Sequence, residues 1–332
     1  MLEKPSIPDE KISTYVRAEF GLRATDVNFL PLGADRNTAV YKVFTEGPTP
    51  YFLKLRSGPF NEVSVTLPKF LRDQGISQII APLPAKSGEL WANLEGFNAI
   101  LYPFIDGLDG YQVGLSERQW VEFGKTLHGI HAVELPAWLS GCLRRETYSP
   151  TFRKTVHAFI ENADRQTSSD PISRETRVVL KKQRPVILHL LGRAEELVAS
   201  LQHQSLDFCL CHADIHAGNM LIEPDGALHI VDWDEAILAP KERDLMSIGA
   251  NLFGGWRSPV KEEKLFYQGY GQTPINGAVL AYYRHERIIA DLALECQQIF
   301  ETDGKNKDRE QALKFLLSNF QPGGTIALAR RT

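Results

Sequence analysis

The residues between His212 and Asp232 have the types and the spacing that phosphoryl transfer requires. They form the pattern H-x-D-x-H-x-x-N, which ends at Asn219, and Asp232 follows inside the apolar stretch HIVDW. Phosphoryl transfer needs an aligned acceptor, metal ions on the phosphates and cations near the developing charge, but little covalent help. Asp214 can accept the proton of an acceptor hydroxyl. The oxygens of Asn219 and Asp232 suit Mg²⁺, which prefers such ligands.

Two other interpretations of this segment stay open. His212, Asp214 and His216 are residue types that bind zinc. Alternatively, the segment is a structural loop in which Asp and Asn side chains make turns. A strand-rich region upstream favours phosphoryl transfer, because that chemistry needs a nucleotide-binding element beside the loop.

The first hundred residues are the elements that must position this segment. A helix is expected over 9–21, and strand patterns fill most of 27–101, including a hairpin formed by AVYKVFT and YFLKLR. A helix is expected over 61–74, and a strand pair turns near Glu95 and Gly96. This part is therefore predicted to be a mostly antiparallel sheet with one inserted helix.

The rest of the chain is predicted to be mainly helical. Ser116 can cap a helix that runs through His131. Further helices are expected over 151–163, 174–201, 241–250, 260–270, 276–300 and 306–318, and the tail QPGGTIALARRT is expected to be loosely held. The prediction is an α+β fold with a β lobe over 1–105 and a larger helical lobe over 106–332, which carries a helical insert at about 140–205.

Composition excludes several classes of protein. The net charge of −4 argues against a nucleic-acid-binding protein. No apolar run is long enough to span a bilayer, and the first residues lack the apolar core of a signal peptide. The four cysteines suggest neither a disulfide framework nor a metal pair, and Cys209 and Cys211 fit a buried strand. We expect a cytoplasmic protein with no membrane or nucleic-acid partner.

The segment from His212 resembles the catalytic and metal loops of the aminoglycoside phosphotransferase family, whose members are relatives of protein kinases. The resemblance implies a bilobal protein-kinase-like fold that uses ATP and Mg²⁺. It implies Asp214 as the catalytic base, with Asn219 and Asp232 as metal ligands. It also implies that His212 supports the loop and that Asp244 braces it, although Asp244 also fits a first-turn helix acid.

The same resemblance implies a nucleotide site in the first lobe. Lys54 in YFLKL would contact the α and β phosphates, and Glu62 in NEVSV would hold Lys54 in place. Gly33 in PLGADRN is the single glycine where protein kinases have a glycine-rich loop. Ordinary alternatives are a surface strand lysine, a glutamate favoured by the helix dipole and a simple hairpin turn.

The stretch ILYPFIDG fits a hinge that binds adenine. Pro103 can offer a carbonyl to the 6-amino group but has no N–H, and Ile105 can offer an N–H. Tyr102 directly precedes them. A plain strand end is the alternative.

The acceptor is expected to be a small molecule. The interval between Asp232 and Asp244 is too short for the activation segment of a protein kinase. The stretches YSPTFR and YYRHERI, outside the catalytic core, resemble family members that act on spectinomycin. The implied reaction moves the γ-phosphoryl group of ATP to a hydroxyl of a cationic aminocyclitol or aminoglycoside antibiotic, with spectinomycin as the expected acceptor and antibiotic resistance as the outcome.

A cationic acceptor favours carboxylates around its site. The candidates are Asp234, Glu235, Glu286 and Asp291, although Asp291 and its neighbours also fit a solvated helix face with salt bridges. Three alternatives for the whole protein stay open: a kinase for choline, a sugar or an amino alcohol; a nucleotide-binding module without catalysis; and a protein kinase. The oligomeric state is not predicted.

Overall fold

The computed structural model describes residues 4–32, 37–165, 170–250, 252–302, 306–321 and 324–329. The chain divides into two compact units. The first unit comprises residues 1–143 with 214–236, and the second comprises 144–213 with 237–332. The first unit therefore takes in the segment from Asp214 to Ala236 as well as the N-terminal sheet, whereas the expected lobe boundary lay at residue 105.

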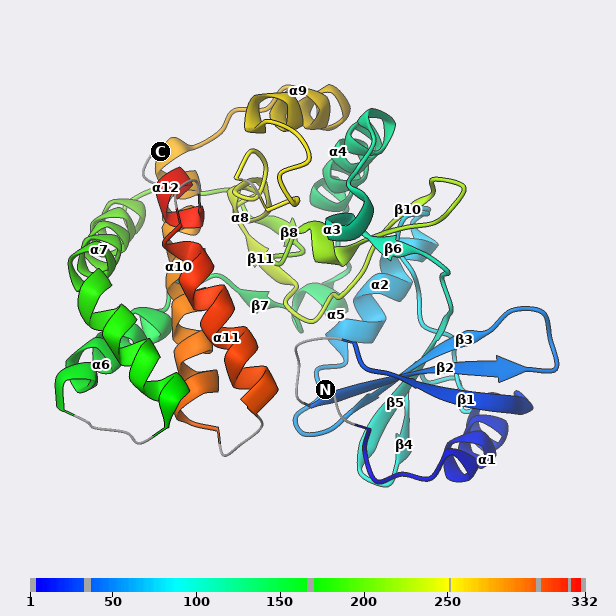
Figure 1. Cartoon of the computed structure of the whole chain (residues 1–332). Coiled ribbons are helices and arrows are strands. Elements are labelled where there is room, and N and C mark those ends of the chain that lie inside the picture. The colour runs from blue at the N-terminus through cyan, green and yellow to red at the C-terminus, as the bar shows by residue number, and fades with distance from the viewer. Residues whose placement is uncertain are drawn as a thin grey trace. The chain divides into compact units, whose positions relative to one another are not determined.

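The first unit is built on a five-stranded antiparallel sheet (Figure 1). Its strands lie in the order β1 (Ala24–Leu30), β2 (Thr38–Thr45), β3 (Tyr51–Arg56), β5 (Phe97–Pro103) and β4 (Ala92–Leu94). The turn between β4 and β5 has two consecutive residues with positive φ, Glu95 and Gly96. A tight hairpin needs that geometry, so the predicted strand pair is confirmed.

The two faces of this sheet have different tasks, because side chains alternate along a strand. One face carries Tyr41, Leu53 and Leu101, which pack with Ile12 and Val16 of α1 (Asp9–Phe20) in one apolar core. The opposite face carries Lys54 and its neighbours at every second position. A slip of one residue in the register would exchange the two faces, so the packing of α1 fixes which side Lys54 occupies.

The remaining elements complete the first unit. These are α2 (Val63–Asp73), β6 (Leu108–Asp109), α3 (Gly110–Val113), α4 (Glu117–Ala132), α5 (Ala137–Ser140), the 3₁₀ turn η1 (Ala217–Asn219), β9 (Met220–Ile222) and β10 (Leu228–Ile230). Ser116 and Gln119 form a reciprocal capping box at the start of α4, as its sequence predicts. Strands β10, β9 and β6 make a small sheet that carries the segment after Asp214.

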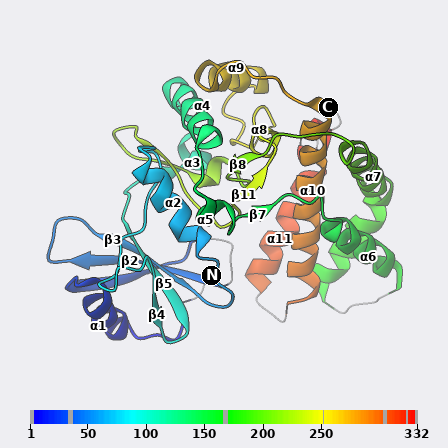
Figure 2. The same cartoon turned by 180° about the vertical axis from the view of Figure 1, so that it is seen from behind.

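The second unit is mainly helical. It contains β7 (Arg144–Arg145), α6 (Thr151–Arg165), α7 (Pro171–Leu201), β8 (Cys209–Cys211), β11 (Ile237–Ala239), α8 (Glu242–Leu245), α9 (Pro259–Tyr270), α10 (Gly277–Phe300), α11 (Asn306–Asn319) and α12 (Thr325–Ala329). Helix α10 lies among α6, α7 and α11 (Figure 2). Its buried apolar residues, such as Ile289 and Leu292, join theirs in one core.

Two predictions for the second unit are wrong in part. The helix expected over 241–250 is regular only in α8, after which the chain continues in turns. The tail is not loosely held throughout, because α12 buries Ile326 and Ala329 in the core around α10. Within the described ranges, no helix has the length and apolar character needed to cross a membrane.

Candidate active site

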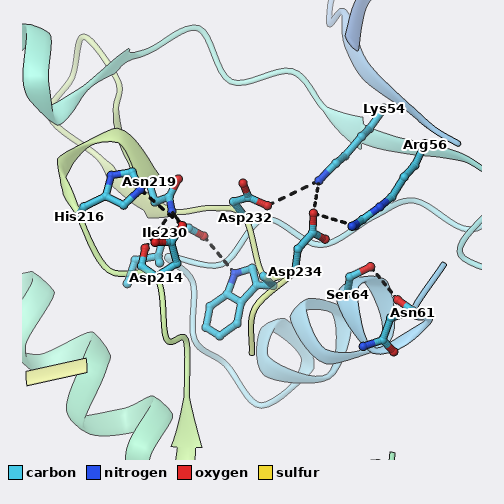
Figure 3. A network of polar contacts seen from close by, with 11 residues as sticks. Lys54, Arg56, Asn61, Ser64, Asp214, His216, Asn219, Ile230, Asp232 and Asp234 are labelled. Carbon is cyan, nitrogen blue, oxygen red and sulfur yellow. Dashed lines mark hydrogen bonds and ion pairs between the residues drawn. The ribbon is translucent and has the colours of Figure 1, made fainter. Parts of the chain in front are cut away.

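Asp214 and Asn219 are held together at the start and end of one short loop in the first unit. The Asn219 Nδ2 group donates to the backbone oxygen of Asp214 at 2.8 Å and to its carboxylate Oδ2 at 3.1 Å (Figure 3). The turn η1 makes this approach possible, because it reverses the chain between the two residues. Since the amide nitrogen of Asn219 is used internally, its amide oxygen is the atom left for a ligand.

His216 lies beside the Asp214 carboxylate in a fixed orientation. The Gly218 N–H donates to His216 Nδ1 at 3.0 Å, and His216 Nε2 lies 3.5 Å from Asp214 Oδ2. The ring also stacks on Tyr111, with 6.0 Å between the centroids. Because Nδ1 accepts a hydrogen bond, the neutral ring carries its proton on Nε2. Nε2 is therefore the ring nitrogen close to the carboxylate, and Nδ1 is already occupied.

Asp232 is tied to the same loop through the backbone. The Val231 N–H donates to the Asn219 carbonyl at 3.1 Å. The Trp233 indole donates to the Ile230 carbonyl at 3.3 Å. Between these anchors Asp232 adopts a φ of 66°, a left-handed conformation that aspartate tolerates better than most residues. Its side chain is about half exposed, at 49%.

Lys54 of β3 faces the aspartates that follow β10. Its Nζ lies 3.6 Å from Asp232 Oδ1 and 3.0 Å from Asp234 Oδ2. The same Asp234 oxygen lies 2.7 Å from Arg56 (Figure 3). Burial alone would lower the pKa of Lys54, but the two carboxylates outweigh it and hold that pKa above its ordinary value. Burial would raise the pKa of Asp234, whereas Lys54 and Arg56 lower it overall.

The expected partner of Lys54 is not its partner in this structure. Glu62 is exposed and directly precedes the first residue of α2. It lies inside a turn in which the Ser64 hydroxyl donates to the Asn61 carbonyl at 2.8 Å. Among the residues that the structure describes, the ion-pair partners of Lys54 are Asp232 and Asp234. In this structure Lys54 is therefore held by the two aspartates and not by Glu62.

Arg56 is a site residue that the sequence analysis missed. It lies two positions after Lys54 on β3, so alternation alone places it on the same face of the sheet. Asp234 in turn lies two positions after Asp232. The spacing of two residues, from Lys54 to Arg56 and from Asp232 to Asp234, could have indicated that Arg56 and Asp234 belong to the site.

The expected hinge lies at the end of β5. Pro103 pairs with Tyr51 of β3, and the Phe104 N–H donates to the Pro50 carbonyl at 3.1 Å. Tyr102 points to the Lys54 face of the sheet, and burial raises its pKa to about 12. Ile105 follows beyond the strand. Gly33 lies outside the described residues.

In the second unit, Asp244 holds the backbone that leads into Asp214. Its side chain is fully buried, and its two oxygens accept the N–H groups of His212 at 2.9 Å and Ala213 at 2.7 Å. Ala213 has a φ of 69°, which is unfavourable for a residue with a Cβ. Asp244 therefore contacts the two backbone groups that directly precede Asp214.

Most carboxylates expected at an acceptor site already have cationic partners. Buried Glu286 pairs with Arg153. Asp291 pairs with Arg287 at 2.9 Å. Asp234 is held by Lys54 and Arg56, as described above. An acid that is already neutralised attracts an ammonium group weakly, so these three are poor candidates for binding a cationic acceptor. Glu235 is exposed and stays a candidate.

A lysine on the third strand of an antiparallel sheet, opposite an aspartate from a separate loop, is the arrangement of kinase-like phosphotransferases. The chain belongs to the phosphotransferase enzyme family, which matches residues 28–281. It is thus an enzyme that transfers a phosphoryl group to a hydroxyl acceptor, and the predicted family and the kinase-like α+β fold are confirmed.

Solved structures extend the likeness over nearly the whole chain. The chain is 33% identical to spectinomycin phosphotransferase APH(9)-Ia in complex with ADP and spectinomycin, with 98% of each chain covered and a TM-score of 0.91. The AMP-bound complex of that enzyme gives 32% identity, coverage of 98% and 99%, and a TM-score of 0.89. An ethanolamine kinase of Plasmodium vivax shares the fold at 14% identity, with a TM-score of 0.59 and coverage of 92% and 83%. No curated protein sequence matches the chain.

Proposed function

We propose that this enzyme transfers the γ-phosphoryl group of ATP to a hydroxyl of a cationic aminocyclitol antibiotic, with spectinomycin as the acceptor. The likeness to spectinomycin phosphotransferase, at 33% identity over 98% of both chains, carries this proposal. The contacts that connect Asp214, Asn219, Asp232 and Lys54 also support it, because they bring together the groups that phosphoryl transfer needs. Because ATP is its phosphoryl donor, we place the enzyme in the cytoplasm.

The nucleotide binds to the face of the sheet that carries Lys54. The Lys54 ammonium contacts the phosphates, and its raised pKa keeps it charged at neutral pH. Adenine lies at the end of β5, where the Pro103 carbonyl accepts from the 6-amino group and the Ile105 N–H donates to the ring. Tyr102 closes this site beside Phe52, with their ring centroids 6.4 Å apart.

The amide oxygen of Asn219 and the carboxylate of Asp232 fit magnesium. They are hard oxygen donors, as Mg²⁺ requires. The half-exposed Asp232 side chain leaves room for the water ligands that this ion keeps. When bound, magnesium neutralises charge on the phosphates.

The protein moves one proton in the reaction. Asp214 takes the proton of the acceptor hydroxyl, whose oxygen forms a bond to the γ-phosphorus while the bond from that phosphorus to the β,γ-bridging oxygen breaks. The N–H groups of Asn219 and His216 face the Asp214 carboxylate and keep it turned toward the acceptor. General base catalysis of this kind contributes about 10²–10⁴-fold.

A panel of acceptors with labelled ATP tests the proposal. Spectinomycin should be phosphorylated with a higher kcat/KM than streptomycin-like aminoglycosides, choline or ethanolamine, and the Asp214→Asn variant should lose this turnover. Expression in a susceptible bacterium should raise its spectinomycin resistance. If ethanolamine or choline had the highest kcat/KM, the enzyme would be a metabolite kinase. ATP binding without turnover of any acceptor would leave a nucleotide-binding module.

A further inference from the structure

We propose that Asp234 and Arg56 form a clamp that positions Lys54. Asp234, two residues after the proposed metal ligand Asp232, would then hold Lys54 in place, as was first expected of Glu62. This inference rests on the proposed role of Lys54 as a phosphate ligand. It concerns a positioning residue, because Asp234 acts on the nucleotide through Lys54 and not by contact with the reacting atoms.

The clamp is built on a single oxygen atom. Asp234 Oδ2 lies 3.0 Å from the Lys54 ammonium and 2.7 Å from the Arg56 guanidinium. Lys54 and Arg56 project from the same face of β3, so the strand fixes the distance between the two cations. Asp234 therefore contacts both cations: Arg56 fixes the position of the Asp234 carboxylate, and this carboxylate holds the Lys54 ammonium (Figure 3).

Asp234 is the stronger of the two partners of Lys54. Its side chain is 19% exposed, whereas that of Asp232 is 49% exposed and lies farther from the ammonium, at 3.6 Å. Ion pairs are screened less when they are removed from water. Asp232 is also the proposed metal ligand, so its charge is shared when magnesium binds. Asp234 is then the anion that keeps Lys54 in place throughout the reaction.

The balance of charge predicts an unusual kinetic signature. Two cations, Lys54 and Arg56, face two carboxylates, Asp232 and Asp234. Removing the charge of Asp234 leaves one positive charge uncompensated, and this attracts the triphosphate. The same change frees the Lys54 ammonium, whose placement matters most in the transition state. The Asp234→Asn variant should therefore lose kcat while its affinity for ATP stays the same or increases.

Glu62 provides the matched comparison. It lies in the same unit, carries the same charge and is the residue that the family resemblance implied, yet it is exposed. Asp73 provides a second control, because it forms an exposed ion pair with Lys69 on α2. Neither Glu62→Gln nor Asp73→Asn should alter kcat or the dissociation constant of ATP by more than about twofold, as is usual for exposed charges.

The experiment measures turnover and binding separately. Steady-state kinetics with spectinomycin should show kcat reduced by about tenfold or more in Asp234→Asn. Calorimetry with ATP, in EDTA and again in magnesium, should show affinity no weaker than wild type. Arg56→Gln should also lower kcat, but by a smaller factor than Asp234→Asn. This variant also keeps the proposal testable if Asp234→Asn fails to fold.

Three results would overturn the clamp. A loss of kcat in Glu62→Gln equal to that in Asp234→Asn would mean that Glu62 also positions Lys54. A loss in Asp234→Asn that is restored by excess magnesium would make Asp234 a metal ligand. Weaker ATP binding with unchanged kcat would make Asp234 a determinant of nucleotide affinity only.

One further measurement does not depend on the acceptor. In a ¹⁵N-lysine spectrum, assigned with Lys54→Arg, the Lys54 ammonium signal should broaden or vanish in Asp234→Asn and persist in Glu62→Gln. If no acceptor is turned over but this pattern holds, the proposed function fails and the clamp stands. If spectinomycin is turned over but the signal is unchanged in Asp234→Asn, the clamp fails and the function stands.

Discussion

Replacing Asp244 by alanine should destabilise the fold strongly through two backbone groups. The fully buried Asp244 side chain accepts the N–H groups of His212 and Ala213 at 2.9 and 2.7 Å. Without it both donors lose their partner. An unpaired buried donor costs about 1–3 kcal/mol, so the two together should lower the free energy of unfolding by about 2–6 kcal/mol. Ala213 also loses the contact that holds its left-handed backbone, which adds to the loss.

Urea unfolding of the wild type and three variants measures this loss. Asp244→Ala should show the full effect. Asp244→Asn keeps one acceptor oxygen and should show a clearly smaller loss of stability. Asp73→Ala removes an exposed carboxylate on α2 and should stay within about 0.5 kcal/mol of the wild type. The reasoning would be refuted if Asp244→Ala lost less than about 1 kcal/mol, or if the asparagine variant were as unstable as the alanine variant.

Three further predictions concern single residues. Asp214→Asn should keep ATP binding by calorimetry but lower kcat by about 10²–10⁴-fold, because positioning survives and proton acceptance does not; unchanged kcat would exclude Asp214 as the base. Asp232→Ala should abolish the magnesium-dependent part of the thermal stabilisation by ATP, and an unaltered shift would exclude it as a metal ligand. Burial raises the pKa of Glu262 from 4.5 to about 7. Between pH 4.5 and pH 7, Glu262 therefore keeps its proton in the folded protein and loses it in the unfolded protein. Stability should therefore fall as the pH rises from 4.5 to 7 and stay reduced above 7, by up to about 3 kcal/mol; Glu262→Gln should remove this part of the pH dependence, and parallel curves for both proteins from pH 5 to 8 would contradict the assignment.

Features fixed by local pattern were predictable from the sequence. The alternation of YFLKLR identifies the strand and the side of the sheet for Lys54, and Ser116 identifies the start of α4. The H-x-D-x-H-x-x-N spacing identifies a loop that brings Asn219 back to Asp214. Each of these depends on neighbours a few residues away, where strand period, capping and turn geometry act.

Features fixed by distant partners were not predictable. The partner of Lys54 is set by the path of the chain after β10, which brings Asp234 to it, whereas the family resemblance implied Glu62. The docking of α12 depends on an apolar surface made by helices far away in the sequence. An acceptor site could not be composed from acidic residues alone, because Glu286 binds Arg153, a distant residue that no local pattern reveals. The pairing of Asp291 with Arg287, in contrast, is the alternative that the helical spacing offered.

Two strained backbone positions lie close to the chemistry. Non-glycine residues with positive φ include Ala213, directly before the proposed base, and Asp232, the proposed metal ligand. Such conformations persist only where other contacts enforce them. Asp244 enforces the one at Ala213, and the backbone bond from Val231 to Asn219 enforces the one at Asp232. The positions of the reacting carboxylates are therefore set by the contacts that maintain two unfavourable turns, and loss of either contact should lower activity before the fold itself is lost.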